Sequence, residues 1–172
     1  KHDNIFDFGS GTCRLLESVI SSSDKDRQFY AYDPAYKAVP ELSELISRYI
    51  GLHENVSVLE DEKEFFDALE TGENDTTLIF ANMVLTHLNP DEMKRFLAKV
   101  KNVDTLVIVC AEPFKSRNMS SALTSLGSFK RKGGLYYHNY NRIFFDYFNL
   151  VCDWFVSASE IKKGFSIKVY QK

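Results

Sequence analysis

The feature that most constrains this chain is a regular alternation of short apolar runs with segments of helical periodicity. Five apolar runs of strand length occupy residues 4–8, 28–32, 55–59, 76–81 and 105–110. The early runs are apolar on both faces, which is typical of parallel strands covered by helices on both sides. The sequence therefore predicts a doubly wound α/β fold.

Helix-boundary residues support this order of elements. Pro40 and the pair Asn89-Pro90 each predict the start of a helix, and Gly51 predicts the end of the first of these two. Further helices are expected over residues 13–20, after Asp61, near Ala122 and around residues 142–148. The rest of the stretch 112–139 is expected to be irregular.

Two late strands are expected near residues 151–156 and 165–170, with a turn at residues 162–164 between them. Because that turn is short, the last strand is expected to run antiparallel. Together with the five earlier runs, this predicts a mostly parallel seven-stranded sheet with an antiparallel last strand and helices on both faces. We expect one Rossmann-like domain over residues 1–172, since no repeat or long linker divides the chain.

Composition narrows the class of protein. Hydrophobic residues make up 44% of the chain, and no run of about 18 apolar residues is available to span a membrane. The net charge of −3 argues against a nucleic-acid-binding protein that is basic overall. Three widely spaced cysteines, Cys13, Cys110 and Cys152, fit a reducing compartment and form no zinc signature. We therefore expect a cytoplasmic monomer with no metal site and no membrane contact.

The residues that could bind a ligand lie where the predicted strands end. The first strand runs into DFGSG (residues 7–11), whose glycines permit a tight turn and a close approach of the backbone to a ligand. The second strand ends at Asp33, whose carboxylate can accept two hydrogen bonds from the ribose hydroxyls of a nucleoside. A dinucleotide fingerprint is excluded because Arg14 stands where its last glycine would be, and the P-loop pattern is absent.

With these residues the sequence resembles the class I S-adenosylmethionine-dependent methyltransferases. The segment DFGSGTC (residues 7–13) is similar to their first motif, a strand followed by an acid and GxGxG, with Cys13 in place of the third glycine. Asp33 matches their ribose-binding acid, Glu60-Asp61 the acidic position beside adenine, and ANMVLTHL (residues 81–88) the segment along the methionine part. The resemblance implies S-adenosylmethionine as cofactor and S-adenosylhomocysteine as product. It assigns cofactor binding to Asp7, Gly9, Ser10, Gly11, Asp33, Pro34, Glu60, Asp61, Asn82 and Met83.

Each of these positions also has a purely structural interpretation. The two glycines fit a plain strand-to-helix turn, and Asp33 fits an N-cap before a proline. Asp61 fits a capping residue for the next helix, while Asn82 and His87 fit structural or merely exposed positions. The sequence leaves these alternatives open.

The acceptor is indicated by the basic segment, which we define as residues 115–142. It holds six Lys or Arg residues and no Asp or Glu, although the chain as a whole is acidic. Cations of this kind track phosphates, and the interleaved aromatic residues offer rings on which unpaired bases stack. The segment therefore favours an RNA substrate. The expected substrate-binding residues are His87, Glu112, Lys130, Arg131, Tyr137 and His138, and no catalytic residue is assigned.

Other functions stay open. The DNA amino-methylating signature [DN]PP[YF] is replaced by ANMV, and no Pro-Cys pair of a cytosine-C5 enzyme occurs. A small molecule or a protein side chain is an alternative acceptor, the basic segment then being a solvated loop. A non-catalytic interaction module that keeps the fold is a further alternative. The family usually has upstream helices, and this chain starts at Lys1, so we expect an upstream segment or a partner to complete the site.

Overall fold

A computed structural model describes residues 3–23, 26–71, 76–103, 106–114, 128–130, 135–138, 140–158 and 163–172. The chain forms two compact units. Unit 1 comprises Lys1–Phe80 with Val103–Thr105, and unit 2 comprises Ala81–Asn102 with Leu106–Lys172.

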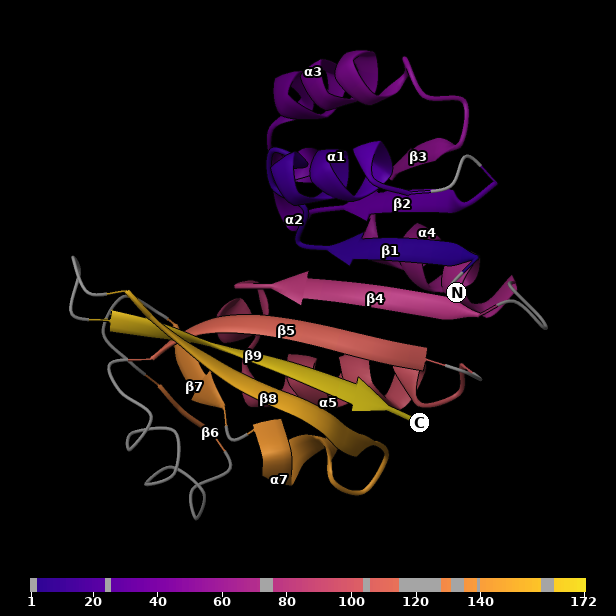
Figure 1. The fold of residues 1–172 in the computed structure, drawn as a ribbon. Coiled ribbons are helices and arrows are strands. Elements are labelled where there is room, and N and C mark those ends of the chain that lie inside the picture. Colours follow the sequence, from indigo (N-terminus) through magenta and orange to yellow (C-terminus); the bar gives the residue numbers. More distant parts are fainter. Residues whose placement is uncertain are drawn as a thin grey trace. The chain divides into compact units, whose positions relative to one another are not determined.

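Unit 1 is built on parallel strands in the order β3-β2-β1-β4 (Figure 1). These strands are β1 (Asn4–Phe8), β2 (Gln28–Tyr32), β3 (Val56–Leu59) and β4 (Thr77–Asn82), the last two residues of β4 being grouped with unit 2. Its helices are α1 (Arg14–Ser21), α2 (Pro34–Ala38), α3 (Pro40–Ile50) and α4 (Glu62–Thr71). All four strands run the same way, so their carboxyl ends share one edge.

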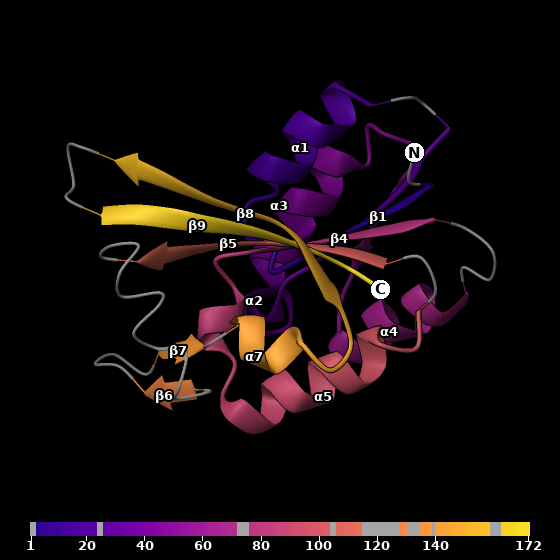
Figure 2. The same ribbon diagram turned by 60° about the horizontal axis from the view of Figure 1, so that its bottom comes forward.

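Helices cover both faces of this sheet because successive strand residues point to opposite sides. On one face, Ile5, Phe29 and Ala31 are buried in a cluster with residues of α1, α2 and α3. On the other face, the ring of Phe65 in α4 lies 5.4 Å from that of Phe6 and 5.6 Å from that of Tyr32. Figure 2 shows α1 and α3 on one side of these strands and α4 on the other.

Unit 2 is built on antiparallel strands in the order β5-β9-β8. These are β5 (Leu106–Phe114), β8 (Asn149–Ala158) and β9 (Lys163–Gln171). A separate antiparallel pair is formed by β6 (Ser128–Lys130) and β7 (Tyr136–His138). The helical elements are η1 (Leu85–His87), α5 (Pro90–Val100) and α7 (Tyr140–Phe144).

The helices α5 and α7 lie on the same side of β5, β9 and β8 (Figure 2). Asn89 is the N-cap of α5 and forms a capping box with Glu92. The helix buries Met93, Phe96, Leu97 and Val100. The ring of Phe144 in α7 stacks on Tyr170 of β9 with centroids 4.6 Å apart. These contacts form the apolar interior of unit 2.

The structure confirms much of the predicted order. The α/β architecture, the parallel strands of unit 1, the helix starts at Pro40 and Pro90 and the antiparallel last strand are confirmed. The single seven-stranded sheet stays a prediction. No helix in the described parts of the chain is long and apolar enough to cross a membrane.

Other expectations differ from the structure or fall on residues that it does not describe. The stretch 112–139 is not simply irregular, because β5 pairs with β9 as far as Phe114 and residues 128–130 pair with residues 136–138. The helix expected around residues 142–148 is α7, which ends at Phe144. Helix α2 corresponds only to the open alternative of Asp33 as an N-cap, and the helix predicted near Ala122 lies outside the described residues.

Candidate cofactor-binding site

The glycine loop, which we define as residues 9–13, turns sharply between β1 and α1. Gly9 and Gly11 have φ angles of 80° and 52°, in the left-handed region that glycine tolerates. The N–H groups of Gly9 and Ser10 donate to the carbonyl oxygen of Tyr32 over 2.8 and 3.0 Å. Nothing among the described residues lies within 4 Å of the position that a Cβ on Gly11 would take. The backbone is therefore open to a ligand at Gly11.

Cys13 stands where the related motif has its third glycine, and it adopts the same kind of backbone. Its φ of 57° is left-handed, and it is the N-cap residue of α1. Non-glycine residues seldom adopt this conformation, so the surrounding contacts must stabilise it. The substitution therefore preserves the path of the loop while adding a buried thiol.

Asp33 connects the glycine loop to the next helix. Its Oδ2 accepts a hydrogen bond of 2.9 Å from the Gly11 N–H, and its Oδ1 accepts one of 2.8 Å from the Ala35 N–H. The second bond makes Asp33 the N-cap of α2, with Pro34 as the first helical residue. The structural interpretation of Asp33 is thus correct. Each carboxylate oxygen keeps a second lone pair, so capping does not prevent Asp33 from accepting a ligand hydroxyl.

Tyr36 was missed by the sequence analysis, yet it holds the glycine loop in place. Its hydroxyl donates to the Gly11 carbonyl oxygen over 2.9 Å and lies 2.8 Å from Ser10 Oγ and 3.1 Å from Cys13 Sγ. Burial raises the pKa of this hydroxyl, which keeps it neutral. The short helix α2 positions this ring, and its Asp-Pro start was the available signal.

Asp7 is a buried acid in the middle of the sheet. It is 1% exposed and lies in register between Ala31 of β2 and Phe80 of β4. Its Oδ2 has no hydrogen-bond partner among the described residues. Burial, and to a lesser extent the negative charge of Asp33, raises the pKa of Asp7 to about 7. A buried acceptor with no partner is unusual, and this one lies just before the glycine loop.

Glu60 and Asp61 lie between the end of β3 and the start of α4. Asp61 Oδ1 accepts a 2.9 Å hydrogen bond from the Glu64 N–H, and this bond lowers the pKa of Asp61. Glu64 Oε2 in turn accepts from the Glu60 N–H over 2.8 Å. The structural interpretation of Asp61 as a capping residue is therefore also correct.

A cavity of about 360 Å³ lies in unit 1 beside the segments that follow the carboxyl ends of β2 and β3. We call it the strand-end cavity. It is lined by Tyr36, Lys37, Pro40, Ser43, Glu44, Glu60 and Asp61. Its volume lies within the range of about 300–1,000 Å³ typical of small-ligand pockets. The predicted adenine-side residues Glu60 and Asp61 thus border a space that extends toward Tyr36.

Asn82, Met83 and His87 belong to unit 2. Asn82 is the last residue of β4, and Met83 follows it with a φ of 59° and 44% exposure. A left-handed methionine is a backbone outlier of the kind that clusters near functional sites. His87 is exposed in η1.

His138 is the predicted substrate residue that the structure describes most fully. It is 2% exposed, and its Nε2 lies 3.0 Å from the carbonyl oxygen of Leu88. Burial lowers its pKa, so the ring is neutral and flanked by Tyr136 and Tyr140. This contact brings β7 next to the segment 81–88.

The other predicted substrate residues are placed by their backbone. Glu112 pairs in register with Ser166, Lys130 with Tyr136, and Tyr137 with Phe129. Arg131 lies outside the described residues. Within the described ranges, no group of three or more His, Cys, Asp or Glu side chains is arranged to hold a metal ion.

Comparison with known proteins relates this geometry to one fold. No protein-family model matches the sequence, and no curated protein matches it as a relative. Among solved structures, magnesium protoporphyrin IX methyltransferase (ChlM) from Synechocystis, with bound SAH, superposes with a TM-score of 0.62 at 14% identity, over 98% of this chain and 74% of that one. The N-methyltransferase NodS from Bradyrhizobium japonicum superposes with a TM-score of 0.67 at 11% identity, over 99% and 86%.

The chain therefore has the fold of the S-adenosylmethionine-dependent methyltransferases. The same fold also occurs in the [4+2]-cyclase SpnF, with a TM-score of 0.67 at 13% identity over 99% of this chain and 74% of that one. At such identities the likeness establishes the fold, and the activity has to be argued from the site.

Proposed function

We propose that this chain is an S-adenosylmethionine-dependent methyltransferase whose unit 1 binds the adenosine part of the cofactor. The observation that supports this most directly is the hydrogen bond between the Gly11 N–H and Asp33 Oδ2. It fixes a loop open to a ligand beside a carboxylate with spare acceptor capacity. The proposal includes the single seven-stranded sheet that the sequence predicts.

The residues present fit the cofactor. Asp33 would accept from the ribose hydroxyls, and the strand-end cavity would take the base beside Glu60 and Asp61. Asp7 Oδ2 is an acceptor that a donor group of the cofactor would satisfy. Asn82 and Met83 stay predictions for the methionine end. The bound cofactor supplies a methyl group already activated on a sulfonium, so this chain has only to bind, orient and exclude water.

For the acceptor, we propose RNA, with S-adenosylhomocysteine as the other product. Support comes from the basic segment, in which Lys130 of β6 pairs in register with Tyr136 of β7 and Arg142 is exposed on α7. A segment that combines cations with aromatic residues suits phosphates and unpaired bases. ChlM is a magnesium protoporphyrin IX methyltransferase, so the fold does not select the acceptor.

Calorimetric titration with S-adenosylmethionine tests the cofactor proposal. We expect the intact chain to bind and Asp33→Ala to weaken binding at least about tenfold, which is ~1.4 kcal/mol or more. Asp67→Ala is the matched control, because Asp67 is an exposed carboxylate of α4 that pairs with Lys63. Since Asp33 caps α2, thermal unfolding is followed in parallel, and Asp33→Asn retains one acceptor oxygen.

Absence of binding by the intact chain would refute the proposed methyltransferase activity and favour the non-catalytic interaction module. Unchanged affinity in Asp33→Ala would remove only the ribose assignment. Transfer of an isotope-labelled methyl group to RNA tests the acceptor, and we expect substrate binding to weaken steeply with salt. Transfer to small molecules or proteins, with none to RNA, would replace the RNA proposal by the alternative acceptor.

A further inference from the structure

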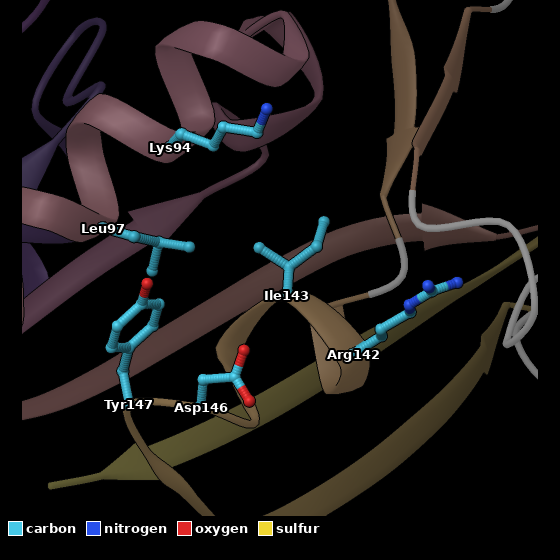
Figure 3. A pocket seen from close by; sticks show the side chains of 6 residues that line it. All are labelled: Lys94, Leu97, Arg142, Ile143, Asp146 and Tyr147. Carbon is cyan, nitrogen blue, oxygen red and sulfur yellow. The ribbon is translucent and has the colours of Figure 1, made fainter.

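Helices α5 and α7 of unit 2 enclose a shallow cleft of about 260 Å³ (Figure 3). It is lined by Lys94, Leu97, Arg142, Ile143, Asp146 and Tyr147. We call it the α5–α7 cleft. Figure 3 shows Ile143 and the Tyr147 ring directed toward the side of α5 that bears Lys94 and Leu97. The centre of the cleft is therefore apolar.

Cations border this apolar centre. The Lys94 side chain is 79% exposed, with its ammonium 3.6 Å from Oδ1 of the likewise exposed Asp91, and Arg142 is exposed on α7. The Lys101 ammonium lies 5.4 Å from the centroid of the Tyr147 ring, within the range of a cation–π contact. Asp146 is the acidic residue of the lining. This local excess of positive charge contrasts with the net charge of −3 of the whole chain.

The size of the cleft limits what can bind there. Small-molecule and cofactor pockets typically measure about 300–1,000 Å³, so this cleft has room for one or two side chains rather than a whole cofactor. Phe145, adjacent in sequence to Asp146, is a large apolar side chain that is 80% exposed, although it is not among the lining residues. These features resemble the grooves that receive the apolar face of a helical peptide.

We propose that the α5–α7 cleft binds a segment of a partner protein that places an apolar side chain between Asp and Glu residues. The apolar anchor packs on Leu97, Ile143 and Tyr147, and the flanking carboxylates lie near Lys94 and Arg142. None of the lining residues belongs to the candidate cofactor site, so this inference does not depend on cofactor binding. It shares Arg142 with the RNA proposal, and competition by a single-stranded RNA oligonucleotide distinguishes the two.

A nucleic acid fits this cleft less well than an acidic peptide. Asp146 lies among the lining residues and would repel a backbone of uniform negative charge, whereas a peptide can place an N–H or a neutral side chain there. The Lys101 ammonium covers one side of the Tyr147 ring, which reduces the surface left for stacking a base. The charge pattern therefore favours a peptide.

Selection of binders from a randomised peptide library against the full chain tests the proposal. We expect selected peptides to combine Leu or Phe with neighbouring Asp or Glu. Their affinity, measured by fluorescence polarisation, should fall at least about tenfold in Lys94→Glu and in Arg142→Glu. Arg95→Glu is the matched control, since Arg95 is an exposed cation of α5 outside the lining. Thermal unfolding of each variant shows whether the fold is retained.

The outcomes separate the possible occupants. Acidic-apolar binders that are sensitive to Lys94→Glu and Arg142→Glu but not to Arg95→Glu support the proposal. Failure to obtain binders, binders without acidic residues, or equal sensitivity to all three substitutions would overturn it. A single-stranded RNA oligonucleotide that competes for the same residues would also overturn it and assign the cleft to nucleic acid.

Discussion

The two units each bury an ionisable side chain in a sheet, and they treat it in opposite ways. In unit 1, Asp7 is 1% exposed and its Oδ2 has no partner among the described residues. In unit 2, Lys168 of β9 is 3% exposed, and its ammonium donates to Asp153 Oδ2 across the pair β8–β9 over 2.5 Å. One buried ionisable group therefore has an oxygen without a partner among the described residues, and the other group is paired.

We interpret this difference as that between a proposed ligand site and a structural contact. Burying a charge without a partner costs free energy, so such a group persists where another requirement maintains it. Asp7 lies two residues before the glycine loop, and in the function we propose a bound ligand supplies its partner. Lys168 already has its partner in register on the neighbouring strand, so its role is explained by the fold alone.

Asp7→Asn should give the largest effect and is the most direct way to break this comparison. The folded-state pKa of about 7 lies above the ordinary value of 3.8, so protonated Asp7 stabilises the fold at low pH. That contribution is present below about pH 4 and is lost as the pH rises toward 7, with an upper bound of about 4 kcal/mol. Denaturant unfolding across this pH range should show the loss in the wild type and not in Asp7→Asn.

The same group sharpens the cofactor proposal. A ligand donor near Asp7 favours the carboxylate, so cofactor binding near pH 6 should release a proton. Titrations in buffers of different ionisation enthalpy measure this release, and Asp7→Asn should abolish it. If the wild type releases no proton, or if both proteins show the same pH dependence of stability, Asp7 is not the acceptor we infer.

Asp153→Ala and Lys168→Met test the paired side of the comparison. Removing Asp153 leaves the Lys168 ammonium buried without its partner, and we expect a loss of about 3 kcal/mol in unfolding free energy. This is the lower end for such pairs, because the Asp153 side chain is 43% exposed. Lys168→Met removes the charge itself and should change stability little. Equal losses in the two variants would show that the lysine contributes more than a satisfied charge.

The parts of the site that sequence predicts are those set by local chemistry. The strand ending at Phe8, the left-handed Gly9 and Gly11 and the position of Asp33 follow from composition and spacing over a few residues. The sequence also predicts capping by Asp33 and Asp61 as an alternative to cofactor binding, because an acidic residue before a helix is a local signal.

The parts that sequence missed depend on register or on a marginal element. The contact between Asp153 and Lys168 and the pairing of β6 with β7 depend on the strand register. A shift of one residue would move every side chain of a strand to the opposite face of the sheet. Helix α2 has five residues, too short for periodicity to reveal, and its formation depends on the Asp33 cap. Tyr36 was missed for the same reason.

Tyr36→Phe measures how far unit 1 depends on this missed residue, and its effect should be the smallest of the three. The variant leaves the Gly11 carbonyl, Ser10 Oγ and Cys13 Sγ without the hydroxyl they contact, at a cost of about 1–2 kcal/mol in stability. Because the loop then loses its fixed path, cofactor affinity should fall several-fold although Tyr36 need not touch the ligand. Calorimetric titration beside thermal unfolding measures both effects.

Tyr30→Phe is the control for this variant, since the Tyr30 ring stacks on Phe6 on the face covered by α4. It should leave cofactor affinity unchanged. If Tyr36→Phe binds the cofactor as tightly as the wild type while being less stable, the hydroxyl supports only the fold. The hydrogen bonds to Asp33 and to the Tyr32 carbonyl oxygen would then be sufficient to hold the glycine loop in the conformation that binds the cofactor.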